Sequence, residues 1–254
     1  TMFDFIVFGG GMIGSALALG LGQQGHNVAI IEQHLPAPFS PDQPPDIRMS
    51  ALSLGTIKLL QRLGAWDAIC NMRAQPYDKL TVWETAADES GRTQFDAQSI
   101  GVEKLGCFVE NRLTQLGLHQ QLKMLPNVTW FTAVKIVELD CDKASLKLSD
   151  GQQINANYIF GADGAQSQVR SLANIGQTGW QYGQQALGIT VETAGPSTHE
   201  TWQRFRPSGP IAYLPMFERY AALIWYDDAD TINELKHLPI DALTKRVKAV
   251  FGEL

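Results

Sequence analysis

The sequence predicts an α/β fold in which a parallel sheet, built around a βαβ unit near the N-terminus, is accompanied by a second, mainly antiparallel sheet. Two observations lead to this prediction. Residues 5–8 and 27–31 are short apolar segments typical of buried parallel strands, and a glycine-rich turn and a helical run of small and apolar residues separate them. Several later segments are rich in branched and aromatic residues, as strands usually are. These later segments are residues 80–84, 186–192, 211–216 and 221–225.

The composition is that of a globular protein with one large domain or two modest ones. The 254 residues are 44% hydrophobic and 18% charged, with a formal net charge of −6, which excludes a disordered, collagen-like or coiled-coil chain. The longest basic run is the pair Lys245-Arg246, so the basic surface that nucleic-acid binding needs is missing. Cys70, Cys107 and Cys141 are too widely spaced for a metal knuckle or a disulfide framework. We therefore expect a cytoplasmic protein without a nucleic-acid partner.

Metal-dependent and serine-nucleophile chemistry find no support in the residue spacing. The histidines are His26, His34, His119, His199 and His237. They show no HxxxH or HExxH spacing, and no cysteine pair accompanies them. Ser167 lacks the second glycine of a GxSxG elbow. We predict no metal site.

The N-terminal turn has the spacing of a dinucleotide-binding motif. In Gly9-x-Gly11-x-x-Gly14 the first glycine allows the tight turn, the second allows backbone to approach a pyrophosphate, and the third allows helix and strand to pack closely. The helix begins at Met12, where free N–H groups and the helix dipole favour an anion. Glu32 ends the second strand, where a carboxylate accepts the hydroxyls of an adenosine ribose. The motif predicts a Rossmann-like unit that binds NAD or FAD; the alternative is a glycine turn of purely structural origin.

A second strand-to-helix turn carries a carboxylate. Residues 158–160 form a short apolar strand that leads into Gly-Ala-Asp163-Gly164, followed by Ser167, Val169 and Arg170. Taken alone, this segment is equally well explained as a structural turn in which Ser167 caps the next helix.

The two turns together resemble those of the group A flavoprotein aromatic monooxygenases. The resemblance implies that the cofactor is FAD and that Asp163 and Gly164 lie near its pyrophosphate, in a region also linked to NAD(P)H use, with Ser167 and Arg170 holding the turn. That family also places two arginines at the cofactor. Residues 46–52 and 109–112 look like the corresponding segments, so the resemblance marks Arg48 and Arg112.

Within that family the chain is most similar to the ubiquinone-pathway hydroxylases. This resemblance implies an enzyme that takes hydride from NAD(P)H, reacts with O2 to form a flavin C4a-hydroperoxide, and hydroxylates the ring of a polyprenyl benzoquinol or phenol. It also implies work at the inner membrane surface, beside other enzymes of the pathway. The sequence shows no basic amphipathic anchor, so we expect membrane contact that is indirect or that is made by a missing C-terminal part. The matching stretches are residues 36–39, 63–68, 180–182, 201–203 with Phe205, 209–210, 214–215 and 223–227.

One motif of the family has no counterpart here. The family carries a Gly-Asp-Ala stretch near the flavin ribityl chain, and nothing like it follows Asp163. We therefore expect a C-terminally truncated chain that is inactive by itself. Two other functions stay open: a non-catalytic nucleotide-binding or assembly module, and an NAD-dependent dehydrogenase that uses the first βαβ unit alone.

The expected domains are discontinuous. Residues 1–75 and 100–175 would form an incomplete FAD-binding domain, and residues 76–99 and 176–254 a partial, inserted substrate domain. Aromatic residues crowd the last third of the chain and could line a pocket for an aromatic ring, although most of them would be sheet core. The resemblance places the strands of Tyr213 and Trp225 beside the flavin ring, which makes these two the weak pocket candidates. No catalytic acid or base is expected, because the cofactor carries the chemistry.

Overall fold

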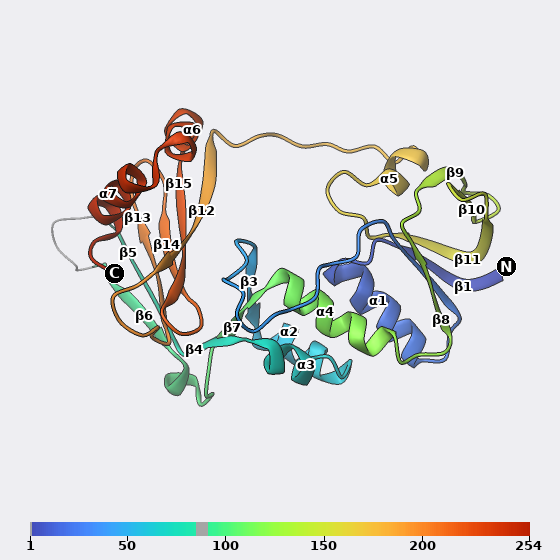
Figure 1. Ribbon diagram of the computed structural model, residues 1–254, viewed down its shortest axis with the longest axis horizontal. Coiled ribbons are helices and arrows are strands. Elements are labelled where there is room, and N and C mark those ends of the chain that lie inside the picture. Colours follow the sequence, from blue (N-terminus) through green and yellow to red (C-terminus); the bar gives the residue numbers. More distant parts are fainter. Residues whose placement is uncertain (1, 85–90) are drawn as a thin grey trace. The chain divides into compact units, whose positions relative to one another are not determined.

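The computed structural model describes residues 2–84 and 91–254, which divide into two compact units (Figure 1). The chain passes between the units several times, so neither is a continuous stretch of sequence. The first unit comprises Thr1–Asp42, Lys58–Met72 and Asn111–Gly179. The second comprises Gln43–Ile57, Arg73–Glu110 and Trp180–Leu254.

The first unit is built on a six-stranded sheet with the order β8-β2-β1-β11-β10-β9. Strand β1 pairs in parallel with both β2 and β11, and β2 pairs in parallel with β8, whereas β9 and β10 form an antiparallel extension. Helices α1 and α4 pack against each other, and α1 also contacts β1 and β2. The bounds are β1 Met2–Phe8, α1 Met12–Gln23, β2 Val28–Glu32, α4 Asn111–Leu122, β8 Val128–Thr132, β9 Ile136–Asp140, β10 Ser145–Leu148, β11 Gln153–Gly161 and α5 Gln168–Leu172.

The apolar pattern of the two N-terminal strands explains their central position. Ile6 and Val7 of β1 and Ile30 and Ile31 of β2 are fully buried, as expected for strands of a parallel sheet that is covered on both faces. Helix α1 packs closely against its neighbours because four of the five residues that it buries are small, namely Gly14, Ser15, Ala18 and Gly22. A Cβ atom on its Gly22 would lie 2.8 Å from a side-chain atom of Leu125.

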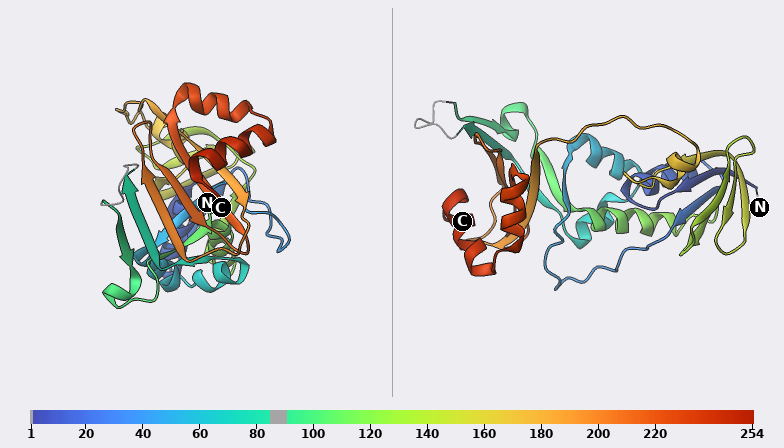
Figure 2. Two further views of the ribbon diagram at one scale, coloured as in Figure 1. Left: turned by 90° about the vertical axis from the view of Figure 1, so that its left-hand side faces the viewer. Right: turned by 90° about the horizontal axis from the view of Figure 1, so that it is seen from above.

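The second unit is built on another six-stranded sheet, with the order β12-β15-β14-β13-β5-β6. All neighbours in it are antiparallel except β13 and β5. Helices α6 and α7 cover one face (Figure 2), where Trp225 and Leu223 of the sheet pack with Phe251 of α7. The bounds are β5 Lys79–Glu84, β6 Thr93–Asp96, β12 Gln184–Glu192, β13 Glu200–Phe205, β14 Ile211–Pro215, β15 Tyr220–Asp228, α6 Ala229–His237 and α7 Ile240–Phe251.

The predicted α/β class is confirmed, and so is the position of each strand and helix predicted above. The three-stranded sheet β3-β7-β4 was not predicted, and it explains why the units differ from the expected domain boundaries. Strands β3 and β4 both pair with β7, so residues 43–57 and 100–110 belong to the second unit rather than to the first. Residues 85–90 of the expected 76–99 segment lie outside the described residues. The remaining bounds are β3 Met49–Ser53, α2 Leu54–Arg62, α3 Trp66–Met72, β4 Gln75–Tyr77, η1 Ala97–Ile100 and β7 Gly106–Glu110.

Residues 36–46 form a proline-rich loop with five prolines, and a buried ion pair attaches this loop to the small sheet. The Arg73 guanidinium donates from Nε and Nη2 to the two carboxylate oxygens of Glu110, both at 2.7 Å, and from Nη1 to the backbone carbonyl of Gln43 at 2.9 Å. Glu110 also accepts the backbone N–H of Asp46 at 2.7 Å. The Glu110 side chain is only 2% exposed, so its charge depends on these donors for compensation.

Replacing Glu110 with Ala is expected to lower the free energy of unfolding by about 3 kcal/mol, because the Arg73 charge would stay buried without its partner. Urea unfolding of the 254-residue chain measures this change. The matched control is the double variant Arg73→Met/Glu110→Leu, which removes both charges. We expect its free energy of unfolding to fall much less. An equal loss in both variants would show that the ion pair is not the reason.

Candidate nucleotide-binding site

A cavity of about 450 Å³ lies in the first unit at the carboxyl ends of β1, β2 and β11. Both predicted turns line it. Gly9, Gly11 and Glu32 come from the first βαβ unit, and Asp163 and Gly164 come from the turn after β11. The carboxyl edge of a parallel sheet is where α/β proteins bind nucleotides. This cavity is therefore the candidate functional site.

The parallel pairing of β1 with β11 brings the two turns together. Phe8 and Gly161 are opposite each other at the ends of these strands. The backbone N–H of Ala162 donates to the Phe8 carbonyl at 2.7 Å, and the N–H of Gly9 donates to the Ile31 carbonyl at 2.8 Å. The turn at Gly9 is thereby held between its two neighbouring strands.

Two of the three motif glycines are required by the fold itself. Gly9 has a φ of +108°, and a Cβ atom there would lie 2.3 Å from the Ala162 carbonyl oxygen. A Cβ atom on Gly14 would lie 1.8 Å from the Gly9 carbonyl oxygen. These positions would need glycine even in a protein that bound nothing.

Gly11 differs from both. Its φ of −70° and ψ of −171° suit any residue, and no described atom lies within 4 Å of the position that a Cβ would occupy. Helix α1 begins at the next residue, Met12, and Gly11 provides no side-chain cap. The open space in front of uncapped helix N–H groups is what a pyrophosphate requires. The residues present therefore fit the ADP part of a dinucleotide.

Glu32 connects this turn to the end of β2. One carboxylate oxygen accepts the N–H of Gly10 at 2.6 Å, and the other accepts the N–H of His34 at 2.8 Å. A carboxylate has about four acceptor sites, so acceptor capacity is left for ribose hydroxyls. The half-buried carboxylate lines the cavity, as the predicted ribose contact needs.

Asp163 shapes its own turn. Its carboxylate accepts the Ser167 hydroxyl at 2.5 Å and the N–H of Gln168 at 2.6 Å. Ser167 caps α5 by accepting the N–H of Arg170 at 3.0 Å, and the Arg170 guanidinium donates to the Ala165 carbonyl. Ser167 and Arg170 thus hold the turn, as expected. The turn therefore does both things that the sequence suggested. Ser167 caps a helix, and Asp163 lines the cavity.

Three polar residues under the first turn were not predicted as functional. The Gly10 carbonyl accepts hydrogen bonds from Ser15 Oγ at 2.9 Å, Gln115 Nε2 at 2.7 Å and His119 Nε2 at 2.7 Å. Gln115 and His119 come from α4, far along the chain, and no sequence motif marks them. Burial lowers the pKa of His119 below its ordinary value and outweighs the opposing effects of the Gly10 carbonyl and Glu32; Lys123 lowers it further.

The two predicted arginines lie in different units. Arg112, in the first turn of α4, donates from Nη1 to the carbonyls of Ala37 and Pro38 at 2.9 and 3.0 Å, and so holds the start of the proline-rich loop. Arg48 belongs to the second unit. Its side chain is exposed and makes no hydrogen bond or ion pair with the residues that the structure describes. A cofactor contact for either arginine stays a prediction.

Tyr213 and Trp225, the weak pocket candidates, both belong to the helix-covered core of the second unit. Tyr213 stacks on Trp202 with ring centroids 5.7 Å apart and lines a cavity of about 240 Å³. Trp225 is 2% exposed and donates its indole N–H to Asp227 at 3.1 Å. Both side chains contribute to packing, whatever further role they have.

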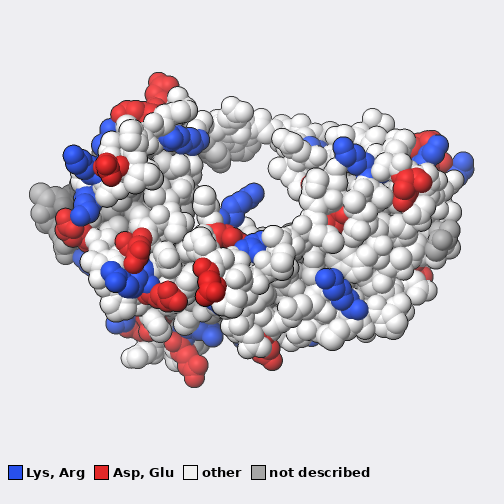
Figure 3. Space-filling view, viewed as in Figure 1, with Lys and Arg blue, Asp and Glu red and all other residues white. Residues whose placement is uncertain are grey.

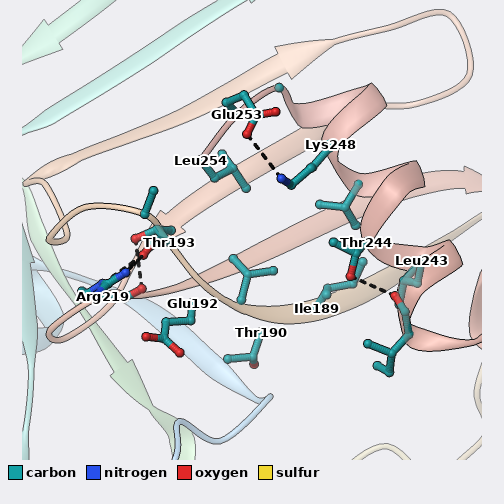
Figure 4. Close-up of a pocket in the computed structure, with 15 residues that line it drawn as sticks. Ile189, Thr190, Glu192, Thr193, Arg219, Leu243, Thr244, Lys248, Glu253 and Leu254 are labelled. Atoms are coloured by element: carbon teal, nitrogen blue, oxygen red, sulfur yellow. Dashed lines mark hydrogen bonds and ion pairs between the residues drawn. The ribbon is translucent and has the colours of Figure 1, made fainter.

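A larger cavity of about 510 Å³ lies between β12 and α7 of the second unit (Figure 4). Ile189 and Val247 form part of its apolar wall. Its two cations are already engaged, because Arg219 donates to the Thr193 carbonyl and Lys248 pairs with Glu253 at 3.5 Å. None of the predicted motif residues lines this cavity, so the nucleotide site lies elsewhere.

Charge is mixed on the face shown in Figure 3, where both acidic and basic side chains occur. Within the described part of the chain, no three His, Cys, Asp or Glu side chains are placed to hold a metal ion. Among the same residues, no helix combines the length and the apolar character that crossing a membrane requires.

The fold and the cavity define a Rossmann-type nucleotide-binding protein. The chain belongs to the FAD binding domain family, which matches residues 2–252.

Its relatives work in ubiquinone biosynthesis. The chain is 41% identical over 250 residues to 3-demethoxyubiquinol 3-hydroxylase of Escherichia coli (strain K12), an alignment that covers 98% of this chain and 63% of that enzyme. It is 30% identical to the mitochondrial ubiquinone biosynthesis monooxygenase COQ6 of Danio rerio, covering 98% of this chain and 54% of that protein. The chain therefore spans less than two thirds of the length of these relatives.

Solved structures share the fold. PqsL of Pseudomonas aeruginosa, described as a probable FAD-dependent monooxygenase, superposes with a TM-score of 0.79 at 19% identity, covering 98% of this chain and 67% of that one. The p-nitrophenol 4-monooxygenase PnpA of Pseudomonas putida superposes with a TM-score of 0.73 at 18% identity, covering 100% and 63% of the two chains.

Replacing Gly11 with Ser separates binding from folding. Ser is a good N-cap residue, and the position of Gly11 has space for it. We therefore expect the free energy of unfolding to change by less than about 1 kcal/mol. The hydroxymethyl group fills the space in front of the helix, so we expect FAD to bind at least about tenfold more weakly. Flavin fluorescence titration and urea unfolding measure the two effects. Gly9→Ala is the contrasting variant, and we expect it to lose stability instead. If Gly11→Ser binds FAD as tightly as the wild type, the pyrophosphate does not lie at this position.

The lowered pKa of His119 predicts a pH dependence of stability. The unfolded state takes up the proton near the ordinary value of 6.5, whereas folded His119 resists it. The contribution of neutral His119 to the free energy of unfolding is therefore fully present above the unfolded-state pKa. It is lost as the pH falls through 6.5 towards the lower pKa of the folded state. Urea unfolding of the wild type and of His119→Gln at several pH values between about 5 and 7.5 tests this, because the window brackets the ordinary His pKa. We expect the wild type to lose more stability at acidic pH; parallel curves would contradict the lowered pKa.

Proposed function

We propose that this protein is an FAD-dependent monooxygenase that uses NAD(P)H and O2 to hydroxylate the ring of a polyprenyl benzoquinol. The observation that supports it is the cavity that both motif turns line, in a chain 41% identical to 3-demethoxyubiquinol 3-hydroxylase. A glycine turn of purely structural origin explains Gly9 and Gly14 but not the open space at Gly11. A dehydrogenase that used only the first βαβ unit would leave the turn at Asp163 without a role in the cavity.

The chain's own residues would bind and orient the cofactor. The N–H groups at the start of α1 would hold the pyrophosphate, Glu32 would accept the ribose hydroxyls, and the turn at Asp163 and Gly164 would form the opposite wall. When bound, FAD supplies the redox chemistry that amino-acid side chains lack. The protein contributes orientation and the exclusion of water, which is consistent with the lack of a predicted catalytic acid or base.

The relatives also support a proposal about where the protein works. A polyprenyl tail is insoluble in water, so a hydroxylase of such a quinol needs access to the inner membrane surface, beside other enzymes of ubiquinone biosynthesis. The contact would be peripheral. Flotation with liposomes that contain a polyprenyl quinol tests this proposal; a protein that stays in the soluble fraction under all lipid compositions would contradict it.

The first experiment is an FAD titration, followed by flavin fluorescence, of the 254-residue chain and of a version extended to the full length of the relatives. We expect the extended version to bind FAD tightly, because more of the cofactor would be enclosed, and to consume NAD(P)H and O2 when quinol is added. The 254-residue chain is expected to bind FAD more weakly and to be inactive.

Two outcomes would point to the other functions. Binding of NAD by both forms, with FAD bound by neither, would favour the NAD-dependent dehydrogenase. FAD binding by the extended version without quinol-dependent consumption of NAD(P)H or O2 would favour the non-catalytic module.

A further inference from the structure

The least exposed histidine in the first unit lies directly under the phosphate-binding turn. His119 is 3% exposed, and its Nε2 atom is 2.7 Å from the Gly10 carbonyl oxygen and 3.0 Å from Ser15 Oγ. A carbonyl oxygen only accepts hydrogen bonds, so Nε2 must carry the hydrogen. The contact therefore specifies the tautomer of the ring.

The peptide that this hydrogen bond holds is the one that ends in the Gly11 N–H. No peptide bond is cis in the described part of the chain, and in a planar trans peptide the C=O and N–H bonds point in opposite directions. The Gly10 carbonyl points toward α4, where His119 and Gln115 donate to it, and it also accepts the hydroxyl of Ser15 from α1. The Gly11 N–H must then point away from α4, and Gly11 lines the nucleotide cavity.

Gly10 is also held from its other side. Its N–H donates to Glu32 at 2.6 Å, and a Cβ atom on Gly10 would lie 2.9 Å from the Cβ of Glu32. Both peptide planes that meet at Gly10 are thus fixed by side chains from different elements. A turn that is ordered before binding loses less conformational entropy when the ligand arrives.

We propose that His119 is a positioning residue of the nucleotide site: by donating from Nε2 to the Gly10 carbonyl, it fixes the Gly10–Gly11 peptide so that the Gly11 N–H faces a cofactor pyrophosphate. The proposal rests on the proposed FAD binding. It concerns a buried residue that does not line the cavity and would act through the backbone of the turn.

The surroundings keep His119 a neutral donor. Lys123, which directly follows the end of α4, opposes protonation of His119, and Glu32 of β2 is the acidic group that favours it. Other residues beside it are uncharged. They are Trp130 of β8, whose ring meets the imidazole edge-on at 4.9 Å, Ser15 of α1, and Gln115 of α4, which donates to the same carbonyl. Protonation would place a second N–H on Nδ1 in this buried environment, at the cost of desolvating a charge.

The test compares three variants of α4 in whichever form of the protein binds FAD in the titration above. His119→Leu removes the donor and keeps an apolar side chain. His119→Gln keeps an N–H donor near the same place. Thr114→Val is the matched control, because Thr114 is a buried polar residue of the same helix whose hydroxyl has no hydrogen-bond partner among the described residues.

FAD and ADP affinities are measured for each variant, and the Gly11 amide signal of the ligand-free protein is followed by ¹⁵N NMR. We expect His119→Leu to weaken both ligands about tenfold, the equivalent of one hydrogen bond, and to shift or broaden the Gly11 amide signal. We expect His119→Gln to stay within about threefold of the wild type and Thr114→Val to match it.

The outcomes separate the two proposals. If the wild type binds neither FAD nor ADP, both the proposed function and this role of His119 are wrong. If the wild type binds and His119→Leu binds equally well, the role of His119 alone is wrong. A loss of affinity that Thr114→Val shares, or that His119→Gln fails to restore, would mean that α4 packing rather than the hydrogen bond is responsible.

Discussion

The candidate site depends on one interaction, the parallel pairing of β1 with β11. These strands are separated by more than a hundred residues of sequence, yet they meet in a register that ends both at the same edge, with Phe8 opposite Gly161. Without that pairing, the glycine turn and the turn at Asp163 would be two unrelated loops. With it, the N–H of Ala162 bonds to Phe8, and the two turns become opposite walls of one cavity.

This close pairing also divides the motif glycines into two kinds. Gly9 and Gly14 are glycine because neighbouring backbone occupies the space that a side chain would need. Gly11 is glycine although the fold leaves space for a side chain there. A motif match by itself cannot make this distinction, because the same three letters satisfy both requirements. The position that the fold does not explain is the one that carries the functional argument.

Sequence reasoning predicted the local features well and the non-local ones poorly. The βαβ unit and the strand before Asp163 were predictable because apolar runs and turn glycines are local signals. The β3-β7-β4 sheet was not, because its strands pair across many residues and carry no periodic pattern. The expected domain boundaries therefore put residues 43–57 in the FAD-binding domain, whereas the contacts of the fold group them with the second unit. Tyr213 and Trp225 illustrate a further limit: alternation places them on one face of their strands but does not show that the helices cover that face.

Ser15, Gln115 and His119 form a polar cluster around the Gly10 carbonyl. Burying these polar groups costs free energy, and the orientation of the turn accounts for this cost. Ser15 and His119 are buried, and an apolar core at this place would avoid the desolvation of their polar groups. An apolar replacement would, however, leave the Gly10 carbonyl buried without a donor, which costs about 1–3 kcal/mol, and would free the peptide to rotate. Three donors on one carbonyl exceed what satisfying it requires, since a carbonyl has two lone pairs. The additional donor restrains the direction in which the Gly10 carbonyl points. The cluster is therefore better explained by orientation of the Gly11 N–H than by stability of the fold.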